Sequence, residues 1–303
     1  MKRIFLPTLA AGMLFAGCVS NTDGPNDWLR LGLKGNVASI TDTFYEAELA
    51  DNGNVVLGNL IQGEKENRQV LPIRKIDFNE DGFWTNVANI DSSGVEQKRF
   101  EYTYDGTKLI EEKGFQNGAM FFHNTYRFEE DRKIYAEYDN IEFGKRWAYE
   151  DQYVGEKRTY RYRTNPDGNM DKLSFVYLED GTYKIVPENE AASKEPIFYY
   201  DSEDKVVRIE FPKETRTYFY DTKGRLLKSY KNDELEMEYI YDTDDQLVQL
   251  YGFHLYPYMK ISHRTYHYTY SDFDKQGNWR KCYEYFNDER TPRMIQIREI
   301  SYY

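Results

Sequence analysis

Histidine and cysteine, which often bind metals or carry out catalysis, are few in this chain, and their spacing suits neither role. His263 and His267 have the i, i+4 spacing that binds zinc when both lie on one helix face. Their surroundings, Tyr266-His-Tyr-Thr-Tyr270, are typical of a strand, where this spacing separates two side chains by about 13 Å. Cys282 lies in the strand-like segment 279–285, where a buried thiol is favoured over a nucleophile. We expect no metal site and no cofactor.

Carboxylates are abundant, but no pair of them forms a recognisable catalytic pattern. Those considered are Glu112, Glu129, Glu130, Asp201, Glu234 and Glu236. A glycosidase needs two carboxyl groups about 5–9.5 Å apart, one with a raised pKa, and any acidic sheet supplies such pairs by chance. Asp242-Thr-Asp-Asp245 lacks the downstream Glu of a calcium loop, and capping of a turn explains its aspartates. No serine-hydrolase motif is present. The sequence therefore predicts no catalytic residues.

One aromatic segment stands out as a candidate contact surface. Tyr251-Gly-Phe-His-Leu-Tyr-Pro-Tyr258 interrupts a regular spacing of Tyr-Asp steps and lengthens the interval between Asp242 and Asp274 to 32 residues. Loops carry binding residues more often than the scaffolds that hold them. The candidate ligand-contact residues are Tyr251, Phe253, His254, Tyr256 and Tyr258. Elsewhere, recurring aromatic residues are expected to form the core of a thin sheet through cross-strand pairs.

The regular spacing comes from a repeat. Tyr218-Phe-Tyr-Asp-Thr-Lys-Gly224-Arg-Leu-Leu227 and Tyr239-Ile-Tyr-Asp-Thr-Asp-Asp245-Gln-Leu-Val248 place the Tyr-Asp step 21 residues apart. Tyr-x-Tyr puts two aromatic rings on one face of a strand, because side chains alternate with period two. Asp and Gly then occupy the first and fourth positions of a type I turn, and a Leu/Val return strand follows. Looser copies occur at 76–82, 102–106, 126–129, 160–168, 198–207 and 273–279. This pattern predicts an all-β antiparallel meander of hairpins.

The composition is typical of a folded β-protein that does not bind nucleic acid. Mean hydropathy is −0.83, yet aromatic residues reach 17%, whereas disordered chains are poor in aromatics. The net charge of −12 repels phosphate backbones, so no nucleic-acid partner is expected. With only two cysteines, one of them near the N-terminus, no disulfide framework is expected.

The first residues predict an export signal. Lys2 and Arg3 precede an apolar run that is too short to span a bilayer, and small residues lead into Cys18. Leu14-Phe-Ala-Gly-Cys18 resembles the lipobox of bacterial lipoproteins, with Phe15 where Leu is usual, and this resemblance implies diacylation of Cys18. An ordinary signal peptide that happens to contain a cysteine is the alternative. The expected division is a signal peptide over 1–17, a lipidated Cys and tether over 18–27, and one β-repeat domain over 28–303.

The repeat itself resembles that of a known family. Tyr-x-Tyr-Asp-x-x-Gly-Arg-Leu at 218–226 is similar to the YD repeat of RHS proteins, and looser copies cover most of 76–279. Segments 33–40, 274–279 and 298–303 are similar to the ends of small YD-repeat lipoproteins of the Gram-negative envelope. The resemblance implies a long curved or spiralling sheet and carries no catalytic residues.

These observations favour a lipid-anchored cell-envelope protein that binds a glycan or a protein and is not an enzyme. The membrane is an expected partner through Cys18, and Val19 after it favours the outer membrane by similarity to lipoprotein sorting, with the periplasmic or surface face left open. A structural envelope-assembly component is the first alternative. A carbohydrate-active hydrolase is the second.

Overall fold

The computed structural model describes residues 26–61, 64–65, 68–69, 71–188, 196–252, 264–287 and 289–303. One short helix precedes a long series of strands. The elements are α1 (Asp27–Arg30), β1 (Val37–Leu49), β2 (Val55–Leu60), β3 (Glu64–Lys65), β4 (Arg68–Gln69), β5 (Ile73–Phe78), β6 (Trp84–Ile90), β7 (Glu96–Asp105), β8 (Lys108–Gln116), β9 (Ala119–Glu129), β10 (Arg132–Asn140), β11 (Lys145–Val154), β12 (Lys157–Thr164), β13 (Met170–Tyr177), β14 (Tyr183–Pro187), β15 (Ile197–Tyr200), β16 (Val206–Glu210), β17 (Thr215–Tyr220), β18 (Leu226–Lys231), β19 (Glu234–Tyr241), β20 (Leu247–Gly252), β21 (Arg264–Phe273), β22 (Trp279–Phe286) and β23 (Met294–Tyr302).

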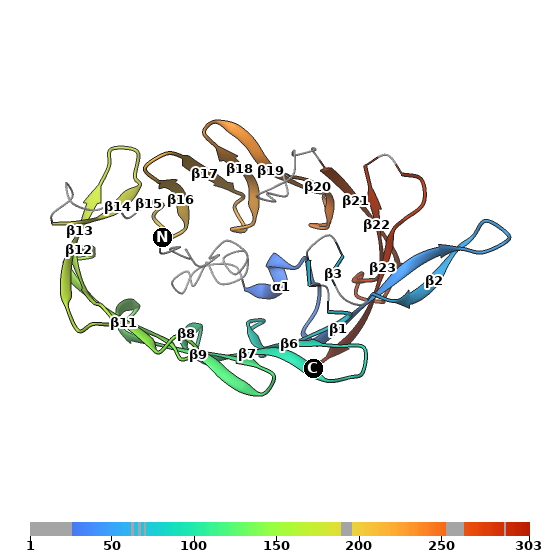
Figure 1. Ribbon diagram of the computed structural model, residues 1–303, viewed down its shortest axis with the longest axis horizontal. Helices are drawn as coiled ribbons and strands as arrows, with labels where there is room; N and C mark the ends of the chain where they lie inside the picture. Colours follow the sequence, from blue (N-terminus) through green and yellow to red (C-terminus); the bar gives the residue numbers. More distant parts are fainter. Residues whose placement is uncertain are drawn as a thin grey trace, which may run out of the picture.

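The strands form a closed ring rather than an open sheet (Figure 1). From β5 to β23 each strand pairs antiparallel with the next, and β1 pairs with both β23 and β5. The resulting barrel has 20 strands, and β2 extends the sheet as a hairpin on β1. The predicted all-β antiparallel meander is confirmed. The expected long curved or spiralling sheet is corrected, because β1 supplies a partner for both edges and so closes the sheet.

Short turns capped by aspartate connect many of the hairpins, as the repeat predicts. In the turn after β17, Oδ1 of Asp221 accepts hydrogen bonds from the backbone amides of Lys223 and Arg225, both at 2.9 Å. Gly224 has a φ of 73°, and Asp204 and Asp245 hold the equivalent position in other turns with φ values of 63° and 66°. The left-handed residue is needed to complete this type of hairpin turn.

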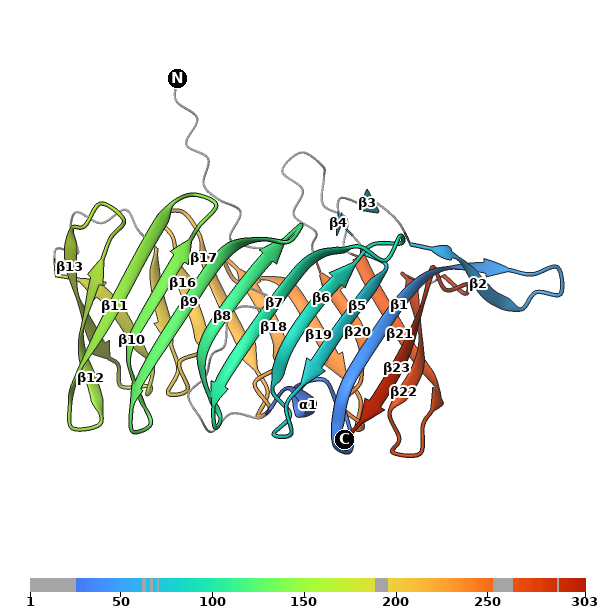
Figure 2. The ribbon, with the colours of Figure 1, turned by 90° about the horizontal axis from the view of Figure 1, so that it is seen from below.

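Six such turns, capped by Asp or Asn, lie at one rim of the barrel, which also carries α1. We call it the turn rim and define it by the turns 79–83, 178–182, 201–205, 221–225, 242–246 and 274–278. It is the lower rim in Figure 2, whereas the hairpin of β1 and β2 projects from the upper rim.

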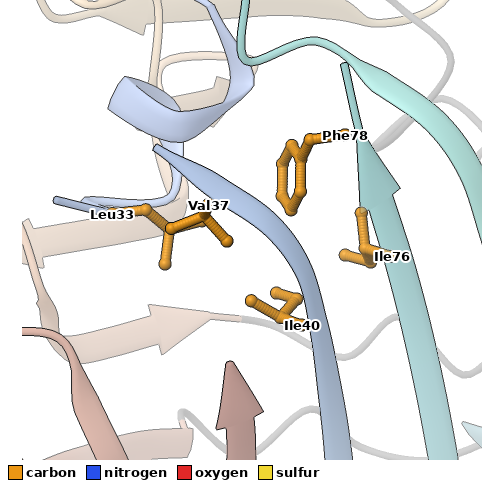
Figure 3. Close-up of a cluster of buried hydrophobic side chains, with 5 residues drawn as sticks. All are labelled: Leu33, Val37, Ile40, Ile76 and Phe78. Atoms are coloured by element: carbon orange, nitrogen blue, oxygen red, sulfur yellow. The ribbon is translucent and has the colours of Figure 1, made fainter. Parts of the chain in front are cut away.

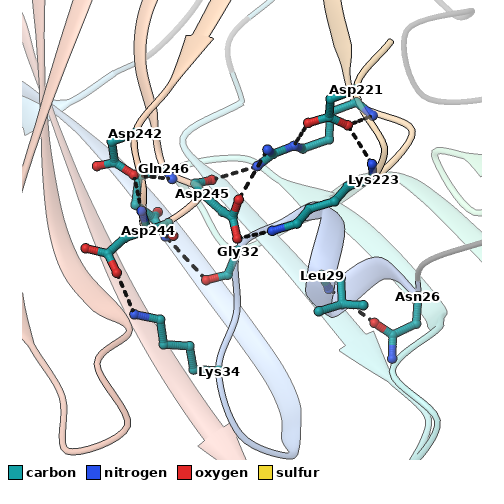
Figure 4. Close-up of polar contacts among 11 residues, drawn as sticks. Asn26, Leu29, Gly32, Lys34, Asp221, Lys223, Asp242, Asp244, Asp245 and Gln246 are labelled. Atoms are coloured by element: carbon teal, nitrogen blue, oxygen red, sulfur yellow. Dashed lines mark hydrogen bonds and ion pairs between the residues drawn. The ribbon is translucent and has the colours of Figure 1, made fainter.

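The segment that contains α1 lies inside the ring and is bound to the turn rim (Figures 1 and 4). The side chain of Asn26 caps α1 by accepting from the amide of Leu29 at 3.1 Å. Nearby, the side chain of Asn278 both accepts from the amide of Lys34 and donates to its carbonyl, each at 2.7 Å. Gln246 donates to the carbonyl of Gly32 at 3.3 Å. The turns of two separate hairpins are thus joined through the chain that follows α1.

An apolar cluster packs this segment against the inner wall of the barrel (Figure 3). Its buried members are Leu33, Val37, Ile40, Ile76 and Phe78. Trp28 of α1 packs against Phe78 with ring centroids 6.3 Å apart, so the strand face that carries these residues is the inner face. Among the described residues, no helix is long and apolar enough to cross a membrane.

A buried ion cluster lies where the ring closes. Asp42 of β1 is fully buried and binds Arg298 of β23 through two hydrogen bonds of 2.7 and 2.9 Å. Arg74 of β5 donates to the same carboxylate at 2.8 Å, and the Arg298 guanidinium lies 3.7 Å from the centroid of Trp279. One carboxylate therefore fixes the register of all three strands at the seam.

The outer face of the strands carries charged and amphipathic side chains. Arg146, which is 62% exposed, pairs with Asp139 at 3.1 Å, and Lys228 pairs with Glu238 at 2.8 Å. Outward-facing aromatic rings are covered by cations in several places, as where the ammonium of Lys172 lies 3.9 Å from the centroid of Tyr160.

One copy of Tyr-x-Tyr is inverted relative to the sequence prediction. Tyr160 and Tyr162 face outward, and the residue between them, Arg161, points inward and binds Asp151. In most other copies the tyrosines face inward, as the buried Tyr126 does. The core interpretation of the repeat aromatics is therefore correct for most copies and wrong for this one, because a buried ion pair takes the inner position.

Candidate functional site

Only one of the five predicted ligand-contact residues belongs to the described part of the structure. Tyr251 lies on β20 opposite Glu238 of β19, which places it on the charged outer face. Phe253, His254, Tyr256 and Tyr258 lie outside the described residues, as does Cys18. Their contact role and the lipidation remain predictions.

A groove of about 510 Å³ opens on the outer face next to the turn rim. It extends from the turn after β13 across β15, β16 and β17. It is lined by Leu178, Asp180, Thr182, Tyr199, Asp201, Ser202, Glu203, Lys205, Val207, Arg208, Thr217, Tyr218, Phe219, Tyr220, Asp221 and Thr222. Its volume lies in the range of small-molecule binding sites.

Phe219 supplies the exposed aromatic surface of this groove. Its side chain is 51% exposed, and its ring meets Tyr230 edge-on at a centroid distance of 5.7 Å. Tyr199, on the neighbouring side of the groove, is covered by the guanidinium of Arg208 at 4.8 Å. Leu178 adds further exposed apolar surface. The groove therefore has one uncovered ring beside a cation-capped ring.

Turn aspartates supply acceptors at the edge of the groove. Oδ1 of Asp201 accepts from the amides of Glu203 and Lys205, both at 2.9 Å. Oδ1 of Asp180 accepts from the amide and the hydroxyl of Thr182, and these hydrogen bonds lower the pKa of Asp180. Among the described residues, the Oδ2 atoms of both aspartates have no hydrogen bond to the protein. Both carboxylates are thus held in place by one oxygen and present the other.

The other residues singled out by chemical type have structural surroundings. Cys282 is buried on the inner face, and burial raises the pKa of its thiol to about 12. Glu112 is also buried and accepts hydrogen bonds from Tyr126 and Asn124. His267 lies on β21 between Gln249 of β20 and β22, in the strand predicted from sequence. Within the described ranges, no group of His, Cys, Asp and Glu is arranged to hold a metal ion.

Sequence reasoning missed the groove, although the repeat contained a signal for it. In Tyr218-Phe-Tyr220 and Tyr239-Ile-Tyr241 the middle residue points to the wet face and is apolar. Phe219 and Ile240 are both well exposed, whereas the equivalent position between Tyr102 and Tyr104 is Thr103. An apolar residue at a position that alternation assigns to solvent is therefore the feature that marks this surface.

Comparison with known proteins gives structural similarity only at low levels. No family model and no curated protein sequence matches this chain. Two solved structures described as TcdB2-TccC3-Cdc42 and TcdB2-TccC3-TEV are similar, with TM-scores of 0.31 and 0.30 and identities of 13% and 12%. They cover 73% and 80% of this chain, which spans only 14% and 16% of theirs. A porin-like protein from Bacteroides uniformis has a TM-score of 0.30 and 12% identity, with coverage of 88% of this chain and 99% of its own.

Proposed function

We propose that this chain is a lipid-anchored envelope protein whose barrel binds a glycan, without catalysis, in the groove lined by Phe219. The anchor is Cys18, as the lipobox-like sequence implies, and the YD-type turns support a relationship to small YD-repeat lipoproteins. The observation that carries the proposal is an uncovered aromatic ring beside prepositioned carboxylate oxygens in one groove.

Sugar chemistry fits these two elements. One face of a pyranose ring presents C–H bonds that pack on an aromatic ring, and its hydroxyls donate hydrogen bonds to carboxylates. Phe219 offers such a ring, and the Oδ2 atoms of Asp180 and Asp201 offer acceptors that need no reorganisation because the turn already holds each side chain. A largely apolar groove with a few placed polar groups is the usual form of a small-molecule site.

The carboxylates of the groove favour binding over hydrolysis. A glycosidase requires a carboxylic acid that stays protonated, and so a raised pKa. The hydrogen bonds from Thr182 move the pKa of Asp180 in the opposite direction. Asp180 therefore accepts hydrogen bonds at neutral pH but does not donate a proton.

The charged side chains on the outer face support the inference that the outer wall of the barrel faces water and not lipid. Barrels that face lipid carry an apolar outer band, and a charged side chain near the bilayer midplane costs about 2–4 kcal/mol. Pairs such as Arg146 with Asp139 and Lys228 with Glu238 lie on this wall instead. The proposed attachment to the membrane is therefore the lipid on Cys18, and the groove remains accessible from solvent.

A glycan-array screen of the purified full-length chain, followed by titration calorimetry of the hits, tests the proposal. We expect Phe219→Ala to weaken binding at least tenfold. The matched control is Phe143→Ala, since Phe143 is an exposed ring in the turn between β10 and β11 at the opposite rim. A blank array from folded protein, or a hit that Phe219→Ala leaves unchanged, would overturn it.

The proposed anchor has its own test. Cys18→Ser should abolish incorporation of labelled palmitate and release the chain from the membrane fraction. Palmitate incorporation that persists in Cys18→Ser would exclude this residue as the site of lipidation.

A structural role in envelope assembly is the second candidate, and one observation favours it. The β1–β2 hairpin projects from the ring (Figure 2), and β2 pairs only with β1 among the described strands. Val56 and Leu57 on β2 are 41% and 46% exposed. An apolar edge strand of this kind is a template for pairing with another chain.

Cross-linking in intact cells distinguishes this role from glycan binding. Val56→Lys should remove a specific cross-linked product if the hairpin docks on a partner, and it should leave glycan binding unchanged. Identical cross-linking patterns for the variant and the wild type would reject the hairpin as a docking element.

A further inference from the structure

A cluster of five charged residues lies on the inner face of the barrel, close to the turn rim and away from α1. Its cations are Lys133 of β10 with Arg158 and Arg161 of β12, and its anions are Asp151 of β11 and Asp204 of the turn after β15. Lys133 stands opposite Phe128 in the β9–β10 register, on the face that carries the buried Tyr126. The cluster therefore points into the barrel and not toward the outer groove.

The two arginines are held by the two carboxylates. Arg161 binds Asp151 through Nε at 2.6 Å and Nη2 at 2.7 Å, a bidentate pair. Arg158 bonds to Asp204 through Nη2, and the hydroxyl of Tyr183 accepts from the same nitrogen at 2.9 Å and donates to Asp204 at 2.5 Å. The arginine positions are thus fixed before any ligand arrives.

Lys133 is the third cation, and no carboxylate neutralises it within the described part of the chain. Its side chain has no ion pair there, and its ammonium lies 5.7 Å from the ring centroid of Tyr126. Burial and the nearby Arg161 lower the pKa of Lys133, against the opposing influence of Asp204. Three cations face two carboxylates, and a buried uncompensated charge is costly unless a counter-ion joins it.

Hydrogen-bond donors remain at the centre of the cluster. Nη1 of Arg161 and the ammonium of Lys133 make no hydrogen bond to the protein among the described residues. Both arginine side chains retain partial exposure, with Arg161 at 18%. The cluster is therefore not sealed from solvent, and Arg donors in a fixed fork match the oxygens of an oxyanion.

We propose that Lys133, Arg158 and Arg161 form an oxyanion-binding site inside the barrel, for a carboxylate, sulfate or phosphate group. The bound group supplies the missing negative charge, accepts from Lys133 and from Nη1 of Arg161, and leaves the Asp151 and Asp204 pairs intact. Tyr153 fixes the backbone of Lys133 by donating to its carbonyl at 2.9 Å, so the lysine side chain can change without loss of this link.

Titration calorimetry of the full-length chain in low-salt buffer tests the site, with sodium sulfate, sodium phosphate and sodium glucuronate as separate probes. We expect at least one probe to bind, and Lys133→Met to weaken it about tenfold or more, since a hydrogen bond to a charged group is lost. Lys133→Arg should restore part of the affinity. The matched control is Lys172→Met, which removes a lysine that also faces an aromatic ring but on the outer wall. Binding of sulfate or phosphate alone assigns the site to an inorganic oxyanion, and binding of glucuronate assigns it to an acidic sugar.

Thermal unfolding without added anion separates this role from a structural one. If Lys133 is an uncompensated cation, Lys133→Met should be at least as stable as the wild type at low salt. Its melting temperature should also rise less than that of the wild type when sulfate is added. If Lys133→Met lowers stability to the same extent with and without sulfate, or if none of the three probes binds the wild type, the site does not exist. Phe219→Ala changes the outer groove and leaves the oxyanion site intact. A negative result for glycan binding is therefore distinguishable from a negative result for oxyanion binding.

Discussion

Removal of the carboxylate at the barrel seam should destabilise the protein far more than removal of a carboxylate on the outer wall. Asp42→Ala leaves Arg298, which is 4% exposed, and Arg74 without their shared partner. Breaking a buried ion pair by deleting one member costs about 3–5 kcal/mol, because a desolvated charge is left behind. The control Asp139→Ala removes the partner of the exposed Arg146 and should cost about 0.2–1 kcal/mol.

Urea unfolding followed by tryptophan fluorescence measures both variants, and equal denaturant slopes would show that the free energies are comparable. A loss for Asp42→Ala no larger than that for Asp139→Ala would refute the idea that the buried cluster holds the seam.

The dependence of stability on pH should also test the role of Asp42. Burial alone would raise the pKa of Asp42, but Arg298 and Arg74 lower it well below its usual range. Its stabilising contribution is therefore complete above the unfolded-state pKa of about 3.9 and is lost as the pH falls below that value. The difference in stability between wild type and Asp42→Ala should shrink on acidification below about pH 4, and a difference that stays constant there would contradict the assignment.

Three further outcomes follow from the packing. Gly114→Ala should cost about 1–3 kcal/mol of stability, because its Cβ would overlap the ring of Phe122, and adding Phe122→Leu should recover part of the loss in the same urea assay. Asp221→Ala should cost about 0.5–2 kcal/mol through loss of the turn cap and should accelerate amide exchange at residues 223 and 225, whereas unchanged exchange would show that the cap is dispensable. In a Cys18→Ser background, Cys282 should resist thiol reagents at pH 8 until the protein unfolds, because burial raises its pKa to about 12, and rapid labelling of folded protein would be inconsistent with its inner position.

Local features of the fold could be predicted from the sequence because they depend on neighbouring residues. Asp221 and Gly224 specify a turn within five residues, and the structure contains that turn with the expected amide hydrogen bonds. The strand containing His267 and the buried position of Cys282 follow in the same way from local alternation.

Closure of the ring and both proposed sites depend on contacts that local patterns do not encode. Asp42 and Arg298 are 256 positions apart, and neither residue type predicts a buried position. The inner location of Arg161 inverts the rule that Tyr-x-Tyr faces the core, because pairing with Asp151 compensates for its burial. Alternation places Phe219, between two tyrosines, on the outer face, but it does not show that β15 and β16 lie beside it and form a groove. Charge pairing and exposure at these positions become visible only once the strands are placed side by side.

Closure through β1 also imposes an order on folding. The hydroxyls of Ser39 and Ser301 meet at 2.7 Å across 262 positions, so the pair that completes the ring is among the most distant in the chain. Hairpins from β5 onward can form one after another from local contacts, whereas one edge of β1 stays unpaired until β23 arrives. An unpaired edge can join to the wrong chain, and contacts this distant form slowly. The interval between the appearance of β1 and that of β23 is therefore the period in which this chain is most open to mispairing. Loss of β23 would convert the closed barrel into a sheet with two unpaired edge strands.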